Sequence, residues 1–314
     1  MSLLRVGAGG WAYFLIPDEG SLRAYSKGFD FVEVNSTFYV FQNLRTLLAW
    51  KRIVPAGFEF SVRCNRKLVS QYCGDKLVND EKREMFLESV ERTCKILQAT
   101  VLTVLLSDSG ARTVSGLERF FSDFHSKGTR VAVEVRGSAP TKELLDILAK
   151  NDAIHCVDIS RDEAPMIESG ILYTRLFGKG EENIYEFDDH ELKQIAEKAS
   201  NPRFEKSILA FHGVRMYRDA ARLKTFLATG KFQRLSNYTG LDALEKALEE
   251  DAAFPSTKSE LLDREGWKLF DQTSDRRTRA EEFLEKLPET TYLSARMVRD
   301  RLERVIKQSS SPAS

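Results

Sequence analysis

The sequence lacks the features that mark several specialised classes of protein. It has no run of about 18 apolar residues that would span a membrane. Residues 1–11 carry no long apolar segment of the kind found in secretory signals. Lys and Arg together number 47, as do Asp and Glu, so no overall charge favours nucleic acid or a membrane surface as a partner. We therefore expect a cytoplasmic protein with no membrane association.

Cysteine and histidine are also scarce, with four of each. Cys64, Cys73, Cys94 and Cys156 form no CxxC pair, which indicates reduced and mostly buried thiols, with a Cys64–Cys73 disulfide as the open alternative. No GxSxG motif for a nucleophilic serine and no GxGxxG fingerprint for a dinucleotide occurs. We therefore expect neither covalent catalysis nor an organic cofactor.

What the chain does contain is a set of eight short runs rich in Val, Ile, Leu and Phe, as expected of strands buried on both faces of a parallel sheet. The runs are 4–6, 31–34, 58–63, 101–106, 130–135, 154–159, 171–176 and 208–211. Segments with apolar residues three or four apart lie between most of them, at 44–53, 80–97, 115–124, 141–149, 188–199 and 217–227, and a short sixth helix is expected around 163–167. This alternation predicts an α/β fold, a (βα)8 TIM-like barrel.

The pattern changes after about residue 232. We expect a barrel with a connecting helix over 1–250, a linker over 251–258, a small C-terminal α+β domain over 259–308 and a disordered tail over 309–314. Within the appendage the pattern predicts a strand over 267–270 and helices over 277–287 and 294–306.

Charged and polar residues stand where the strands of this barrel should end. Alternate strand residues point into a barrel, and functional groups gather at the carboxyl ends of its strands. The residues at matching positions are Glu33, Asn35, Arg63, Asn65, Glu134, Arg136, Asp158, Ser160, Arg175 and His212. Because burying an unpaired charge is costly, these side chains are predicted to line a polar pocket at that end of the barrel.

Three arginines in this set favour an anionic ligand, because a guanidinium group matches the oxygens of a phosphate or carboxylate. We expect Arg63, Arg136 and Arg175 to hold the anion, and Glu33 and Glu134 to act as general acid and base. The leading hypothesis is a lyase, isomerase or hydrolase type of enzyme that acts on a phosphorylated sugar or a nucleotide-like compound.

The remaining predicted site residues have supporting roles. Asp158, counted with the catalytic carboxylates, and Asn35 would orient the reacting groups, and His212 would contact the ligand. Trp11 and Tyr39 would stack on a ring of the ligand, or else pack beneath the loops. The turn 7–10 (Gly-Ala-Gly-Gly) would bring backbone amides to the anion, or is simply a tight turn.

Other interpretations stay open. The strand-end charges could pair with one another into a purely structural network. Glu33, Glu134, Asp158 and His212 are metal-ligand types, but arginines among them would repel a divalent cation, so no metal site is predicted. Residues 276–314 hold nine Lys and Arg against six Asp and Glu. The main alternative is therefore a nucleic-acid-binding or -processing protein, metal-assisted or not, that uses the aromatic strand-end residues and this basic last helix. The final alternative is a barrel without catalysis that binds a protein partner.

Five motifs at the strand ends carry a resemblance to a known family. They are Gly7-Ala8-Gly9-Gly10-Trp11-Ala12-Tyr13, Val32-Glu33-Val34-Asn35-Ser36-Thr37-Phe38-Tyr39, the Trp50, Pro55, Phe58 and Phe60 set, Glu134-Val135-Arg136, and Tyr173-Thr174-Arg175-Leu176-Phe177-Gly178. Over roughly the first 230 residues the chain resembles the DUF72 (YecE-like) family of TIM-barrel proteins. It departs from the family pattern at Ser70-Gln71, at Ser138-Ala139 and at Phe211-His212-Gly213. The resemblance implies the barrel fold but no particular reaction.

Overall fold

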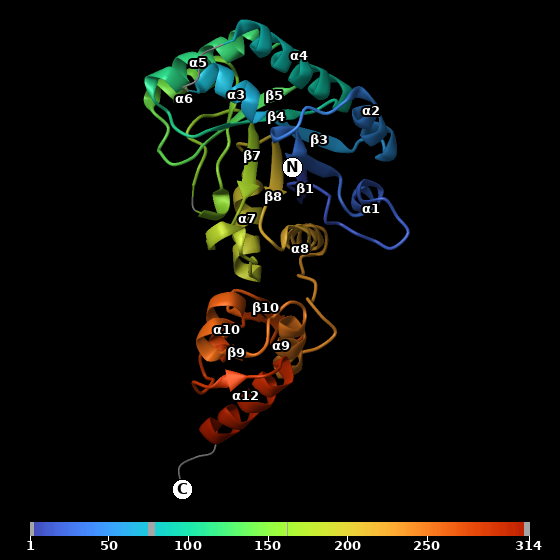
Figure 1. The fold of residues 1–314 in the computed structure, drawn as a ribbon, viewed down its shortest axis with the longest axis vertical. Helices are drawn as coiled ribbons and strands as arrows, with labels where there is room; N and C mark the ends of the chain where they lie inside the picture. The colour runs from blue at the N-terminus through green and yellow to red at the C-terminus, as the bar shows by residue number, and fades with distance from the viewer. Residues whose placement is uncertain (1–2, 75–78, 162, 311–314) are drawn as a thin grey trace. The chain divides into compact units, whose positions relative to one another are not determined.

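The computed structural model describes residues 3–74, 79–161 and 163–310, and in these residues one sheet contains eight parallel strands (Figure 1). The strands are β1 (Leu3–Ala8), β2 (Phe31–Val34), β3 (Glu59–Arg63), β4 (Val101–Leu106), β5 (Arg130–Val135), β6 (Ile154–His155), β7 (Ile171–Leu176) and β8 (Lys206–Phe211). Their order is β6-β5-β4-β3-β2-β1-β8-β7, and an isolated parallel bridge between Val157 and Thr174 brings the two ends together. The fold is therefore a TIM-like α/β barrel, as predicted.

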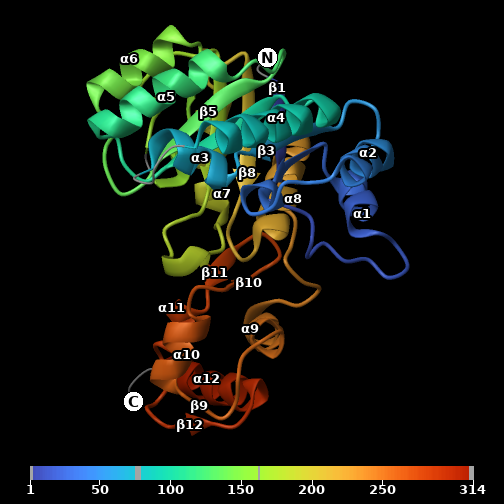
Figure 2. The ribbon, with the colours of Figure 1, turned by 45° about the horizontal axis from the view of Figure 1, so that its top comes forward.

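Figures 1 and 2 show helices around the outside of these strands. They are α1 (Ser21–Gly28), α2 (Leu44–Ile53), α3 (Arg66–Cys73), α4 (Asp80–Leu97), α5 (Ala111–Asp123), α6 (Lys142–Lys150), α7 (Asp189–Ala199) and α8 (Met216–Thr229), with short 3-10 helices η1 (Asn35–Phe38), η2 (Ile159–Arg161) and η3 (Glu181–Asn183). Asn43, Asn79 and Thr141 cap α2, α4 and α6 by accepting a backbone N–H bond. No described helix is both long and apolar enough to cross a membrane.

The sixth helix, expected over 163–167, is wrong. Residues 163–167 are irregular, and β6 itself is shorter than the predicted run. Glu163 accepts a bond from the Asp158 amide, and the Met166 amide donates to Nδ1 of His155. Pro165 has no amide hydrogen to offer a helix. Side chains, and not the backbone of a helical turn, thus accept the hydrogen bonds of backbone amides in this connection.

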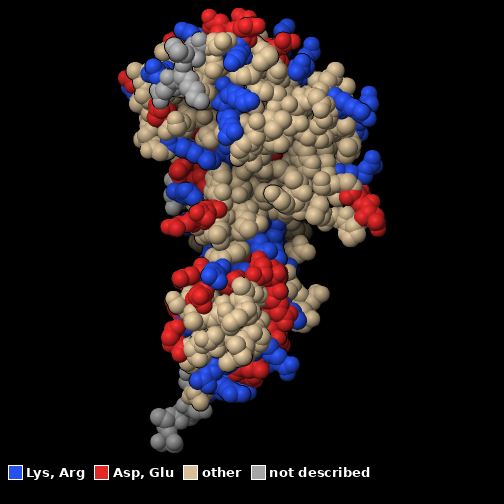
Figure 3. All heavy atoms as spheres, in the orientation of Figure 1, with Lys and Arg blue, Asp and Glu red and all other residues tan. Residues whose placement is uncertain are grey.

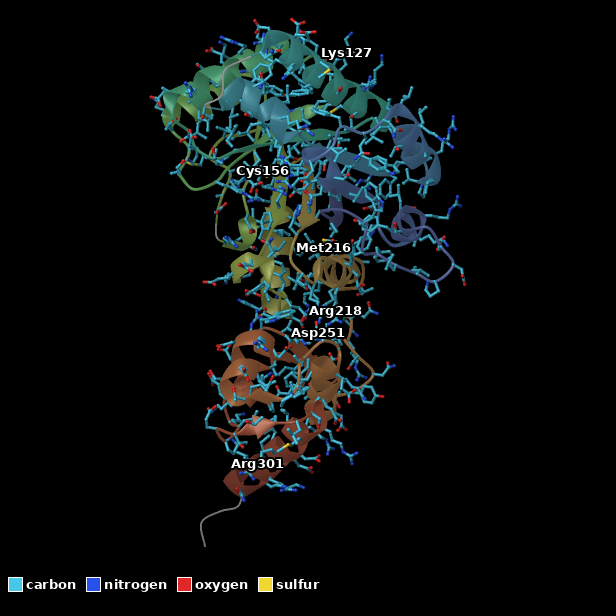
Figure 4. The ribbon with its side chains drawn as sticks, viewed as in Figure 1. Lys127, Cys156, Met216, Arg218, Asp251 and Arg301 are labelled. Carbon is cyan, nitrogen blue, oxygen red and sulfur yellow. The ribbon has the colours of Figure 1, made fainter. Side chains whose placement is uncertain are left out.

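The interior of the barrel is filled in layers. Its middle is a core of inward-pointing residues that includes Phe31, Ala132 and Tyr173, with Cys156 among the strands (Figure 4). At the amino ends of the strands, Glu59 accepts from Arg5 at 2.6 Å and from Lys206 at 2.5 Å. The sequence analysis did not identify this second group of charges. The barrel is therefore a packed core with a charge layer at each end.

All four cysteines are free. Cys64, Cys94 and Cys156 are buried, and Cys73 is partly buried, so the prediction of reduced thiols is confirmed and the Cys64–Cys73 disulfide is wrong. Burial raises the pKa of the Cys73 thiol to about 12, which makes the thiol form dominant at neutral pH.

A second unit comprises residues 178–194, 213–215 and 222 onward. Its elements beyond α8 are α9 (Gly240–Glu249), β9 (Ser256–Thr257), α10 (Lys258–Glu265), β10 (Leu269–Asp271), β11 (Arg277–Arg279), α11 (Glu281–Leu284), β12 (Thr291–Tyr292) and α12 (Ala295–Ser310). Leu244 and Leu248 of α9 belong to its hydrophobic core, together with Leu261, Phe270 and Val298. The α+β character of the appendage is as predicted.

Two local predictions in this unit are corrected. The helix expected over 277–287 is reduced to α11, because residues 277–279 instead form β11, antiparallel to β10. The Arg277 side chain donates to Asp271 at 3.1 Å across this pair, and Thr278 is buried. Of the tail expected over 309–314, residues 309 and 310 continue α12, and 311–314 lie outside the described residues.

Candidate anion site at the carboxyl ends of the barrel strands

The predicted site residues Glu33, Glu134 and Arg175 form a buried ion cluster at the carboxyl ends of β2, β5 and β7. The Arg175 side chain is 2% exposed, and its Nε lies 3.1 Å from Oε2 of Glu33. Its Nη1 donates to Oε2 of Glu134. One guanidinium group thus bridges two carboxylates that are far apart in sequence, as the matching strand parity predicted.

Two further groups hold the Glu33 carboxylate. The Tyr173 hydroxyl donates to Oε2 at 2.7 Å and is also 2.7 Å from Oγ of Ser61. Nε2 of His212 lies 3.2 Å from Oε1 of Glu33 and 3.3 Å from Nε of Arg175. The Arg175 Nε–H donates to Nε2 of His212, so a neutral His212 that accepts this bond carries its hydrogen on Nδ1, and Oε1 of Glu33 has no hydrogen-bond partner among the described residues.

The electrostatics of the cluster keep both carboxyl groups ionised. Burial raises the pKa of Glu33, but the charge of Arg175 and the contacts with His212 and Tyr173 outweigh it and hold that pKa well below its ordinary value. Burial is likewise outweighed at Glu134, whose pKa is lowered by Arg175 and Arg136. Burial and the charge of Arg175 lower the pKa of His212, which favours the neutral imidazole.

Arg63 differs from Arg175 in having no carboxylate partner. Its guanidinium donates to Oδ1 of Asn35 through Nη1 and stacks on the Phe38 ring, 3.9 Å from the centroid. Arg63 is 6% exposed and its Nε has no hydrogen-bond partner, and among the described residues no Asp or Glu forms an ion pair with it. A buried guanidinium without a counter-ion is an unusual arrangement, because burying an unpaired charge is costly.

Arg136 forms the solvent-facing side of the cluster. Its Nε lies 2.7 Å from Oε1 of Glu134, and its side chain is 46% exposed. The guanidinium lies over the Phe177 ring, 5.0 Å from the centroid, and the imidazole of His212 stacks on that ring as well. The cluster therefore reaches the surface through an arginine that an incoming ligand can contact.

The balance of charge in the cluster is positive. At neutral pH the ionised Glu33 and Glu134 face three guanidinium groups, those of Arg63, Arg136 and Arg175, which leaves a net charge of +1. On the surface, by contrast, Lys and Arg are interspersed with Asp and Glu on the face shown in Figure 3. The excess positive charge at the strand ends is thus a local feature.

Asp158 does not contact this cluster in the way the sequence analysis expected. Its Oδ2 accepts the Phe177 amide at 2.9 Å, and its Oδ1 accepts the Ser160 amide at 3.0 Å. Its charged neighbour is Arg161 at 3.5 Å, and burial raises its pKa. These contacts place Asp158 as the anchor of the turns after β6 and β7, one of which carries Phe177.

The first turn serves packing. A Cβ on Gly9 would lie 2.1 Å from the His212 ring, and one on Gly7 would lie 2.1 Å from the Phe31 carbonyl oxygen. The Ala8 amide donates to the Tyr25 hydroxyl and the Gly9 amide to the Phe211 carbonyl. Both amides are engaged within the protein, which argues against the expected anion contact and leaves close packing as the reason for these glycines.

The two aromatic residues expected to stack on a ligand lie at the rim. Trp11 packs edge-to-face on Trp50, with ring centroids 5.0 Å apart. Tyr39 is 52% exposed, packs edge-to-face against Phe38 and lies 5.6 Å from the Arg66 guanidinium. The ligand contacts proposed for both stay predictions.

The sequence analysis did not assign Tyr173 or Phe177 to the site. Tyr173 could have been recognised, because it stands two residues before Arg175 and so points to the same side of β7. Phe177 follows the strand, and no periodic signal marks it. No three His, Cys, Asp or Glu side chains in the described ranges are grouped so that they could hold a metal ion.

The basic last helix is partly neutralised within its own unit. Arg299 lies 3.0 Å from Asp242 and from Asp300 and 3.7 Å from Glu245. Arg296, Arg301 and Arg304 are exposed. A nucleic-acid contact through this helix stays a prediction.

Comparisons with other proteins agree with the fold. The model of a family described as "Protein of unknown function DUF72" matches residues 5–239. Similar solved structures include a DUF72 family protein from Enterococcus faecalis V583 (15% identity, TM-score 0.57, 73% of this chain and 98% of that chain) and one from Thermotoga maritima MSB8 (18% identity, TM-score 0.57, 72% and 99%). A search of curated proteins found no match. The chain belongs to the DUF72 family.

Proposed function

We propose that the protein binds a small anion at the carboxyl ends of the barrel strands, of the kind presented by phosphorylated sugars and nucleotide-like compounds. The observation that carries this proposal is the buried guanidinium of Arg63, which forms no ion pair with a carboxylate of the described residues and whose Nε has no hydrogen-bond partner there. An anion placed against Arg63 and Arg136 would neutralise the excess positive charge of the cluster. This end of the barrel is also where TIM-barrel enzymes bind their substrates.

The proposal divides the three arginines by role. Arg175 is committed to Glu33 and Glu134, so it sets the electrostatic potential and the geometry of the site. Arg63 and Arg136 are the groups that would contact the anion. Asn35 supports Arg63 and Glu134 supports Arg136, each through a direct hydrogen bond.

Proton transfer by Glu33 and Glu134 is disfavoured by their environment. With lowered pKa values, neither carboxyl group holds a proton to donate at neutral pH. Both oxygens of Glu134 and Oε2 of Glu33 already accept hydrogen bonds, from Arg136, Arg175 and Tyr173. We therefore assign the two carboxylates to holding the cations.

Arg63→Met is expected to weaken anion binding while preserving the fold. Methionine keeps the length and apolar stem of the side chain, and no carboxylate is left unpaired. Loss of charge-assisted hydrogen bonds worth about 1.5–3 kcal/mol should weaken binding roughly 10- to 100-fold. Calorimetric titration of the wild type and the variant with inorganic phosphate measures this effect directly.

Arg52→Met is the matched control, because Arg52 lies on the exposed side of α2. It should bind phosphate as the wild type does. Equal phosphate affinity in Arg63→Met and the wild type would refute the proposed site, as would an absence of phosphate binding by the wild type.

A further inference from the structure

A cavity of about 360 Å³ borders the proposed anion site. It lies between α3 and the carboxyl end of β4, and both Arg136 and Phe38 line it. Arg136 is also the outer cation of the ion cluster, and the Phe38 ring carries Arg63 on one of its faces. The cavity and the anion site thus have Arg136 and Phe38 in common, whereas Arg63 does not itself line the cavity.

The rest of the cavity wall is mainly apolar. Val69 and Cys73 of α3 form one side, and Leu105 and Leu106 of β4 form the other. Its volume falls within the range of small-molecule sites, and it has room for about a dozen water molecules at about 30 Å³ each. Polar lining groups besides Arg136 are few, those of Arg66, Ser70, Ser107 and Thr113, so a cavity of this composition favours an apolar group over a polyhydroxylated one.

We propose that the natural ligand is an amphipathic anion whose compact apolar or aromatic body fills this cavity while its charged group meets Arg63 and Arg136. This inference rests on the proposed function and narrows it. The proposed function includes two ligand classes. The flat ring of a nucleotide-like compound suits the apolar walls at Phe38 and Leu105, and a phosphorylated sugar has no such ring. A phosphate ester and a carboxylate share the required chemistry, and both are probed below.

Competing ligands test the inference in the wild-type protein. Phenyl phosphate should bind at least about tenfold more tightly than glucose 6-phosphate or inorganic phosphate, because only its ring gains from leaving water. The affinities for benzoate and acetate give the same comparison for carboxylates, and benzoate should bind more tightly. If phosphate binds but the phenyl group adds nothing, this inference is wrong and the anion site stands. If no anion binds, the proposed function itself fails.

Filling the cavity gives a second test. Val69→Trp should remove the advantage of phenyl phosphate over inorganic phosphate, a loss of about tenfold or more. Lys67→Trp is the control, because Lys67 is exposed on the same helix and does not line the cavity. Retention of the phenyl advantage in a folded Val69→Trp protein would overturn the inference.

Discussion

Replacing Arg175 with methionine is expected to lower the free energy of unfolding by about 3–5 kcal/mol, because breaking a buried ion pair leaves an uncompensated charge. The substitution would leave Glu33, whose side chain is 0% exposed, without a cation in contact, and would leave Glu134, 13% exposed, with Arg136 as its remaining ion-pair partner. Urea unfolding monitored by circular dichroism measures the change. Arg52→Met, the same substitution at an exposed position, should change stability by less than about 0.5 kcal/mol.

A combined variant separates charge from packing. Adding Glu33→Gln and Glu134→Gln to Arg175→Met removes the stranded charges and should recover a large part of the lost stability. If Arg175→Met costs no more than the Arg52→Met control, Arg175 does not neutralise the carboxylates. If the triple variant recovers nothing, the loss came from packing against Phe177 and His212.

The unfolding free energy of the wild type should fall steeply on acidification. Glu33 and Glu134 have pKa values lowered by folding, so their contribution is present above about pH 4.5 and is lost as the pH falls toward their folded values. The pKa of His212 is lowered too, so a further loss begins as the pH falls below 6.5, where the unfolded imidazole takes up a proton. The total loss between pH 7 and pH 3 should be on the order of 3 kcal/mol or more.

The Arg175→Met variant should reverse this trend at Glu33. Without the guanidinium, burial raises the pKa of Glu33, so protonation relieves its stranded charge and acid stabilises the variant relative to wild type, while Glu134 keeps the charge of Arg136. Unfolding curves at pH 7, 5.5 and 4 for both proteins provide the comparison. His155 is buried with a lowered pKa in both proteins, so its contribution cancels. Parallel pH profiles would contradict the assigned role of Arg175.

Most of the barrel was predictable because its strands are short, apolar and separated by helices with clear periodicity. Residues 101–106 and 130–135 were predicted with the bounds that the structure has. The failures arose where side chains from elsewhere decide the local structure. Residues 277–279 have helical neighbours but pair with β10, and the connection after β6 is fixed by Glu163 and His155.

The site was predictable as a group of residues but not as a set of partners. Strand parity alone brought Glu33, Glu134 and Arg175 to one end of the barrel. Strand parity does not predict which arginine forms an ion pair with which carboxylate. That Arg63 forms none with the described carboxylates is therefore seen only in the structure. Asp158 has the right parity as well, yet the turns after β6 and β7 supply its donors.

The cavity beside the site had no signal in the sequence. It depends on the spacing between α3 and the end of β4, which is set by the packing of helices next to its walls. For example, Gly116 of α5 approaches α3 so closely that a Cβ there would lie 2.0 Å from the Tyr72 carbonyl oxygen. Such contacts determine cavities without leaving a motif.

The central claim is that an anion binds against Arg63, and anomalous diffraction tests it most directly. Crystals grown without sulfate or phosphate would be soaked in selenate, and the selenium located from its anomalous signal. We predict a peak within contact distance of the Arg63 and Arg136 guanidinium groups, and none at Arg63 in crystals of Arg63→Met. Selenate bound only elsewhere on the protein, with the Arg63 guanidinium left empty, would contradict the account.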